Sequence, residues 1–236
     1  MNKIIIDEDF WNIFPDAQIN IMLLKDIDNH PKENQTDFYD NMLEQAGDKA
    51  QKYLTNESFK DNLVVANWRE AYQNFKKKKG ARSSIEALLK RVDQGKGVGS
   101  INPLVDLYNS ISLEYGVPVG GEDTDAIKGD LHLGVAKGGE AFYPLGDDKN
   151  EPALLGEVLY YDDDGAVCRC LNWRDGKRTM LTDDTKNAVM VMESVNKEQN
   201  EIIDEAMLQL QKSIKDNLNV EGKIFKLNKN NSVIGE

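Results

Sequence analysis

One stretch of the sequence decides most of the fold: residues 102–109 read NPLVDLYN, and residues 116–123 read GVPVGGED. Asn102 is a favourable helix N-cap, and Pro103 suits the first helical position because the N–H that it lacks would have no partner there. Gly116 can end the helix in a left-handed conformation. The apolar stripe between these ends consists of Leu104, Leu107, Tyr108, Ile111 and Tyr115. The stretch therefore predicts a helix over 102–115 that leads into a glycine loop ending in two acids.

The surrounding pattern alternates between strand and helix signals. A capping box at 83–86 opens a short helix, and the turn Asp162-Asp163-Asp164-Gly165 predicts a hairpin with a solvated tip. Further helices are expected over 37–53, 58–77 and 196–218, and strands over 17–25, 131–136, 157–161, 166–171, 187–194 and, as a sheet edge, 223–227. We predict an α+β fold with a mixed, mostly antiparallel central sheet flanked by helices. Residues 1–95 form a helical portion with one strand, and residues 96–236 form a sheet-rich portion with a C-terminal helix, both within one compact unit.

The chain has 236 residues and a net charge of −12, which argues against a protein that wraps nucleic acid with its whole surface. It contains no run of roughly 20 apolar residues and no signal-peptide pattern at its start. We therefore expect a cytoplasmic protein without a membrane or DNA partner.

The charge is uneven along the chain. Residues 66–100 contain nine basic and three acidic side chains. The basic residues that could hold a small piece of backbone phosphate are Lys76, Lys77, Lys78, Lys79, Arg82, Lys90 and Arg91. From charge alone, a solvated helix end is the favoured explanation of this segment.

Known catalytic and metal-binding signatures are missing from the sequence. His30 and His132 are the only histidines, and neither has a visible nucleophile partner. Cys168 and Cys170 are too close for a favourable disulfide and too few for a zinc site, so we expect reduced residues of the core or of a pocket wall. No metal and no cofactor is predicted.

The segment 168–179, CRCLNWRDGKRT, is unusually polar for the end of a hairpin strand. Its four cations, amide and indole can bind an anion and stack a base. A surface turn whose arginines pair with nearby acids explains the same residues equally well.

Several spaced motifs resemble the B3/B4 domain of the phenylalanyl-tRNA synthetase β chain, and more closely the freestanding proteins that contain this domain. Residues 102–109 resemble the family's N-x-V-V-D-x-T-N helix, and residues 116–123 resemble its G-Q-P-L-H-A-F-D loop. Further matches follow in the family's order at 138–140, 172–176 and 185–193, so that the resemblance covers roughly residues 82 to 195. In the synthetase, this domain is the editing site, where wrongly attached tyrosine is hydrolysed from the tRNA.

The resemblance implies a pocket formed by the helix start, the loop, the polar turn and the last strand. Tyr108 and Asn109 match the family's T-N pair, and Pro118 matches its loop proline. The family's recognition acid falls at Val191, so we expect Glu193, two residues later on the same strand face, in its place. The expected catalytic residues are Asn109, Arg174 and Glu193. The expected substrate-binding residues are Tyr108, Pro118, Gly120, Gly121, Arg169, Asn172 and Trp173.

Two functions from different classes follow from the resemblance. The first is hydrolysis in trans of a mischarged aminoacyl-tRNA, since an activated ester needs only a positioned water and donors to the developing oxyanion. The second is a non-catalytic module that binds a free amino acid, a small carboxylate or an RNA end. A structural or regulatory protein with a vestigial domain is a third reading. Because Gly120 replaces the family's loop histidine and Trp173 and Arg174 fill its glycine turn, the accepted side chain stays open. Aminoacylation by this polypeptide alone is not expected.

Overall fold

The computed structural model describes residues 1–32 and 35–235. Residues 33 and 34 of the predicted helical portion and residue 236 of the predicted sheet-rich portion lie outside the described residues. The strands are β1 (Lys3–Ile6), β2 (Gln18–Leu24), β3 (Gly120–Asp123), β4 (Leu131–Val135), β5 (Val158–Asp162), β6 (Gly165–Arg169), β7 (Arg174–Asp175), β8 (Ala188–Ser194), β9 (Lys223–Leu227) and β10 (Val233–Gly235). The helices are α1 (Glu8–Ile13), α2 (Thr36–Ala50), α3 (Leu63–Ala71), α4 (Ser84–Asp93), α5 (Pro103–Tyr115) and α6 (Lys197–Leu218). Short 3₁₀ turns cover Gln51–Tyr53 and Phe59–Asp61.

The strands form two sheets rather than the single central sheet that the sequence suggested. The larger sheet has the order β10-β1-β4-β5-β6-β7, and the smaller has the order β3-β8-β2-β9. Only the β1–β4 pair is parallel among the strand pairs of the described residues. The predicted class, a mixed and mostly antiparallel α+β fold flanked by helices, is confirmed.

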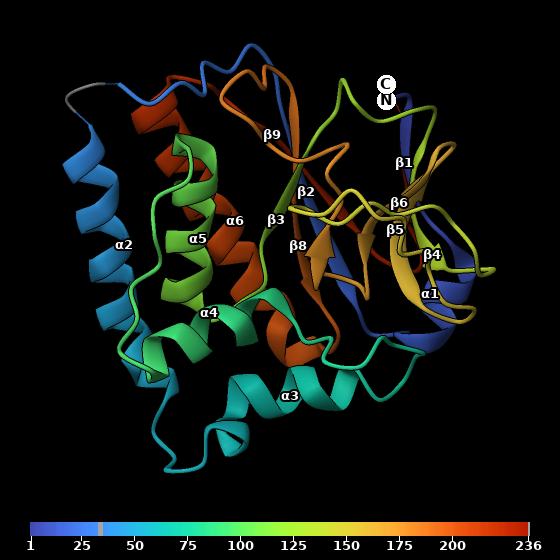
Figure 1. Ribbon diagram of the computed structural model, residues 1–236, viewed down its shortest axis with the longest axis horizontal. Helices are drawn as coiled ribbons and strands as arrows, with labels where there is room; N and C mark the ends of the chain where they lie inside the picture. The colour runs from blue at the N-terminus through green and yellow to red at the C-terminus, as the bar shows by residue number, and fades with distance from the viewer. Residues whose placement is uncertain (33–34, 236) are drawn as a thin grey trace.

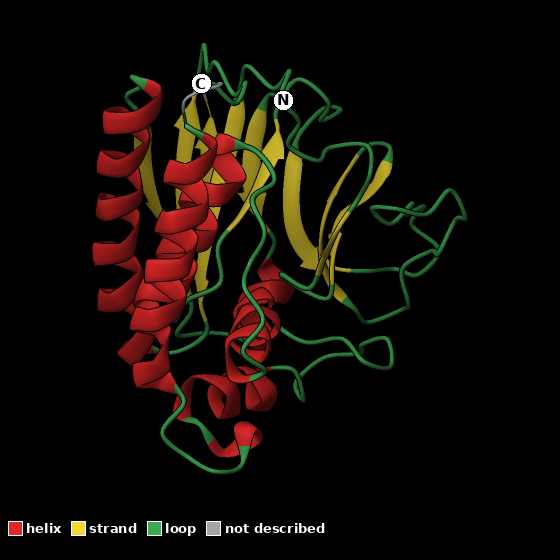
Figure 2. Ribbon diagram, turned by 60° about the vertical axis from the view of Figure 1, so that its left-hand side comes forward, coloured by secondary structure: helices red, strands yellow, loops and turns green. Residues whose placement is uncertain are grey.

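The smaller sheet lies between a layer of helices and the larger sheet (Figures 1 and 2). Strand β8 shows how the sequence specifies this arrangement, because all of its residues are buried and successive side chains point to opposite faces. Val189 and Val191 pack into the core between the sheets, whereas Met190 and Met192 pack against helices α5 and α6. Glu193 stands two residues after Val191 and therefore lies on the same face of β8, which borders the space between the two sheets.

Helix α5 has the ends that its sequence predicts. The Asn102 side chain accepts a hydrogen bond from the Val105 N–H at 3.1 Å, Pro103 occupies the first turn, and Gly116 is left-handed with φ 66°. Helix α4 is likewise capped by Ser83, the residue before its first turn, whose hydroxyl accepts a hydrogen bond from the Glu86 N–H. The capping residues therefore place the two helices that border the site described below.

Other expectations hold in part. The predicted helix over 58–77 is wrong in length: α3 ends at Ala71, although Trp68, Tyr72 and Phe75 are buried as their spacing suggested. At the hairpin of β5 and β6, Asp163 and Asp164 are exposed, but Asp162 is buried. Strand β3 replaces the end of the expected glycine loop, because Gly120–Asp123 pairs with β8.

The first 95 residues contribute two strands, not one, and these strands belong to different sheets. β1 lies between β4 and β10, and β2 lies between β8 and β9. The helical portion is therefore connected to both sheets, while the division at residue 95 stays a prediction. No helix of the described chain is long and apolar enough to cross a membrane.

Candidate functional site

A pocket with a cavity volume of about 240 Å³ opens between the two sheets, beside α4 and α5. Its lining comes from α4, α5, β3, β8, the larger sheet and the turn between β6 and β7. The volume is below the roughly 300 Å³ at which pockets for drug-sized ligands begin. The cavity therefore suits one amino-acid-sized group.

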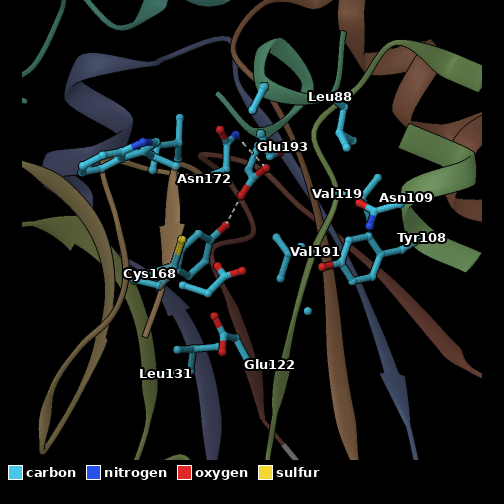
Figure 3. Close-up of a pocket in the computed structure, with 18 of the residues that line it drawn as sticks. Leu88, Tyr108, Asn109, Val119, Glu122, Leu131, Cys168, Asn172, Val191 and Glu193 are labelled. Carbon is cyan, nitrogen blue, oxygen red and sulfur yellow. Dashed lines mark hydrogen bonds between the residues drawn. The ribbon is translucent and has the colours of Figure 1, made fainter. Parts of the chain in front are cut away.

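Glu193 faces this cavity, and its exposed fraction is 3%. The Tyr160 hydroxyl donates to Glu193 Oε1 at 2.8 Å, and the Asn172 amide donates to Oε2 at 3.1 Å, as Figure 3 shows. Burial raises the pKa of Glu193 to about 7, although both hydrogen bonds lower it. At neutral pH this carboxyl is therefore populated in both its charged and its neutral form.

A strained turn holds Asn172 in this position. Cys170 (φ 49°) and Leu171 (φ 66°) are consecutive left-handed residues, a conformation that costs most side chains of order 1–3 kcal/mol each. The Cys170 N–H donates to Glu157 Oε1 at 3.1 Å, and Tyr72 donates to the Cys170 carbonyl at 2.7 Å and to Asn172 Oδ1 at 3.0 Å. The turn is thus anchored on both sides, and the amide of Asn172 is directed to Glu193.

Two further carboxyl groups line the same cavity. Glu122 on β3 is 6% exposed, and its Oε2 has no hydrogen-bond partner among the described residues. Burial raises the pKa of Glu122 well above its usual value, and the nearby charge of Asp175 raises it further. Burial also raises the pKa of Asp175, beside the Cys168 thiol. Neither acid was among the residues that we predicted for the site.

The structure brings together most of the residues that the resemblance placed in the pocket. Tyr108, Asn109, Gly120, Gly121, Asn172, Trp173 and Glu193 all line it. Val191 lines it as well, in agreement with the expectation that Val191 and Glu193 share a strand face. Pro118 is buried next to Val119 but is not part of the lining.

Arg169 requires a correction, because it does not reach the cavity. It neighbours Cys168 on β6, so its side chain points to the opposite face of the strand. There its guanidinium is 2% exposed and donates to Glu157 at 2.8 and 2.6 Å and to the Glu151 carbonyl at 2.7 Å. Arg169 therefore forms an ion pair with the buried Glu157 and does not line the pocket.

The other cations of the polar turn also face acids. Arg178 makes two hydrogen bonds to the buried Asp162, at 2.8 and 2.7 Å, and Lys177 pairs with Asp148 at 2.5 Å. Arg174, predicted to be catalytic, lies outside the lining and 3.9 Å from a Glu151 oxygen. Of the two interpretations of this turn, the structure favours arginines paired with acids over a bound anion.

The basic segment borders the pocket through α4. Arg91 lines the cavity mouth and donates to the Gly97 carbonyl, and Lys90 pairs with Asp93 at 2.7 Å. Lys77 donates to the Tyr72 carbonyl. Lys78 forms an ion pair with Glu151. Among the described residues, Lys76, Lys79 and Arg82 form no ion pair and are exposed.

Both cysteines are free and buried: Cys168 in the pocket wall and Cys170 in the turn below it. Their burial agrees with the expectation that they belong to the core or to a pocket wall. The described residues contain no group of three or more His, Cys, Asp or Glu side chains placed to hold a metal ion.

Strand alternation is the signal that could have identified the missed residues. Glu122 stands two positions after Gly120 on β3, and Tyr160 and Cys168 face each other across β5 and β6. Without the pairing of β3 with β8, however, the sequence does not show that these side chains meet.

Comparison with known proteins agrees with this geometry. Residues 67–218 match the B3/4 domain. Over 110 residues the chain is 29% identical to the phenylalanine–tRNA ligase beta subunit of Neisseria meningitidis serogroup B, which is 47% of this chain and 14% of that protein. The chain is also 35% identical, over 71 residues, to the phenylalanine–tRNA ligase beta subunit of Leifsonia xyli subsp. xyli. This match covers 30% of this chain and 8% of that protein.

A solved structure shows the same fold at lower sequence identity. An N-terminal fragment of the phenylalanyl-tRNA synthetase beta subunit from Pyrococcus horikoshii superposes with a TM-score of 0.51 over 95% of this chain and 53% of that chain, at 14% identity. The chain thus corresponds to a small part of the curated relatives that it matches.

Proposed function

Because the chain belongs to the B3/4 domain family, we propose that its pocket binds the aminoacyl end of a mischarged tRNA and hydrolyses the ester in trans. The relatives are subunits of a ligase that acts on tRNA, which supports this class of substrate. The observation that carries the proposal is a buried carboxyl group, Glu193, that faces a cavity of amino-acid size with a pKa of about 7.

Glu193 has the properties of a general base for this reaction. A base is most effective when its pKa lies near the working pH and it lies within hydrogen-bond reach of the proton that it takes. A water held between Glu193 and the ester carbon gives its proton to the carboxylate as its oxygen attacks. The carbon–oxygen ester bond then breaks, the tRNA hydroxyl takes up that proton, and the free amino acid leaves.

Amide groups of the pocket can support the transition state. Asn172 already donates one hydrogen bond to Glu193, and Asn109 lines the cavity from α5, beside Tyr108 (Figure 3). Donors placed where the oxyanion develops commonly contribute 10²–10³ in rate. We assign this role to Asn109.

The tRNA would approach over α4. This helix forms one wall of the pocket and belongs to the basic segment, in which Lys76, Lys79 and Arg82 are exposed. Trp173, partly exposed at the pocket, offers a surface on which a terminal base can stack, with Arg174 beside it. Binding through phosphates should weaken steeply with salt, since each contact releases counterions.

A deacylation screen tests the proposal. Purified protein is incubated with a panel of correctly and incorrectly charged tRNAs, and amino-acid release is followed over time. We expect selective loss of one mischarged species, a loss of at least a hundredfold in rate for Glu193→Gln, and no change for Glu201→Gln, an exposed glutamate of α6. Decay of every species at the uncatalysed rate would refute the hydrolase.

The same pocket favours a binding module as the second candidate. Both oxygens of Glu193 already accept hydrogen bonds, and the cations near the turn are largely paired with acids. A binding module predicts thermal stabilisation by a ligand without turnover. The three carboxyl groups of the pocket make a ligand with an ammonium group a better candidate than a small carboxylate.

A further inference from the structure

One end of the pocket, opposite Leu88 of α4, contains two acids that the proposed hydrolysis does not use, and we call it the inner end. Glu122 and Leu131 lie at this end, whereas Glu193 lies beside Asn172 toward the other end (Figure 3). If Glu193 acts on the ester, then the group that reaches Glu122 is the far end of the amino-acid side chain. The chemistry at Glu122 therefore decides which side chain the pocket accepts.

Glu122 carries a buried acceptor atom, Oε2, without a hydrogen-bond partner in the described chain. Its side chain lines the cavity at 6% exposure, and its Oε2 accepts no hydrogen bond. The hydroxyl of Thr179, which is 1% exposed, is the neutral group that acts on the Glu122 carboxyl and lowers its pKa, and it brings no positive charge. A buried polar atom without a partner costs roughly 1–3 kcal/mol, so a ligand that supplies a donor here recovers that free energy.

The surroundings of Glu122 do not provide the missing charge. Asp175 adds a second carboxyl group, and the negative charge of Asp162 also acts on Glu122. Arg178 is the cation that acts on it, but both of its Nη atoms donate to Asp162. The inner end is therefore an acidic pair that lacks a counterion.

We propose that Glu122 and Asp175 together bind a primary ammonium group at the end of the side chain of the aminoacyl ligand, a specificity that rests on the proposed function of the pocket. An ammonium group has three donors on a compact centre, and here it meets two carboxyls and the hydroxyl of Tyr108, which also lines the cavity. Charge-assisted hydrogen bonds of this kind are about twice as strong as neutral ones. An apolar side chain of the same length leaves both carboxyls unpaired.

A matched pair of ligands isolates this interaction. L-lysinamide and L-norleucinamide share the α-amino group and an unreactive amide, and they differ in the terminal ammonium of the side chain. Isothermal titration calorimetry should give a Kd for lysinamide at least tenfold below that for norleucinamide. Equal dissociation constants in the unmodified protein would overturn the proposal.

Two variants assign the effect to the acidic pair. In Glu122→Gln and in Asp175→Asn, the preference for lysinamide should fall below threefold, while the Kd of norleucinamide stays the same. Neither substitution removes one half of an ion pair among the described residues, so neither should unfold the protein, and thermal unfolding curves check this. Glu201→Gln should keep the tenfold preference. A preference that persists in both pocket variants refutes the assignment.

The outcome is separable from that of the deacylation screen. A lysinamide preference without turnover overturns the hydrolase and leaves the ammonium site standing. Hydrolysis of mischarged tRNAs together with equal binding of the two amides overturns the ammonium site alone.

Discussion

The replacement of Glu193 by Gln should change the pH dependence of folding stability in a calculable way. Burial raises the pKa of this carboxyl to about 7 in the folded protein, against 4.5 for the unperturbed group. Between these values the folded state holds a proton that the unfolded state has released, so the free energy of unfolding falls as pH rises. At 1.36 kcal/mol per pKa unit, the loss amounts to about 3 kcal/mol by pH 8.

Glutamine is a suitable replacement because it can keep both hydrogen bonds. Its carbonyl oxygen can accept from the Asn172 amide, and its amide can donate to the hydroxyl of Tyr160, which serves as donor or acceptor. The variant therefore removes the titration and keeps the packing. The other pocket acids titrate in both proteins, so their contribution is largely removed when the two proteins are compared.

Urea unfolding at about pH 4.5 and pH 8 measures the effect. From the lower to the higher pH, the unmodified protein should lose about 3 kcal/mol more stability than Glu193→Gln does. The exposed Glu201→Gln should follow the unmodified protein. If Glu193→Gln and the unmodified protein change by the same amount, within about 0.5 kcal/mol, then Glu193 does not titrate as a buried group and its role as a base at neutral pH fails with it.

Three further changes test the structure around the pocket. Arg169→Met should cost about 3–5 kcal/mol of unfolding free energy, because it leaves Glu157, which is 0% exposed, without its partner. The double variant with Glu157→Gln should recover at least half of that loss in the same urea titration, and no recovery would contradict the pairing. Asn102→Ala should cost about 1–2 kcal/mol through the lost helix cap, whereas a neutral result would show that the cap contributes nothing. Burial raises the pKa of both thiols, that of Cys170 to about 12, so Cys168 and Cys170 should react with Ellman's reagent only after unfolding; prompt reaction of the native protein would contradict their burial.

The sequence predicts best what depends on neighbouring residues. The ends of α5 follow from Asn102, Pro103 and Gly116, each of which acts within one helical turn. Glu193 could be placed because strand alternation put it on the face of Val191. These predictions needed no knowledge of which segments pair.

Predictions that depend on distant pairing were incomplete. Arg169 was grouped with the cations of the polar turn, but it lies on the face of β6 opposite Cys168, and the sequence does not show that Glu157 is its partner there. Glu122 and Asp175 line the same cavity although β3 belongs to one sheet and β7 to the other. The local pattern of the sequence does not contain that information.

The order of strands has a consequence for how the chain folds as it is synthesised. β1 pairs with β10, so that Lys3 lies opposite Gly235, and β2 takes β9 as its outer neighbour. β1 and β2 are therefore synthesised well before the strands that pair with them, and contacts of such long sequence separation form slowly. During that interval the backbone groups of β2 lack their partners and its apolar side chains stay exposed, a state that favours aggregation.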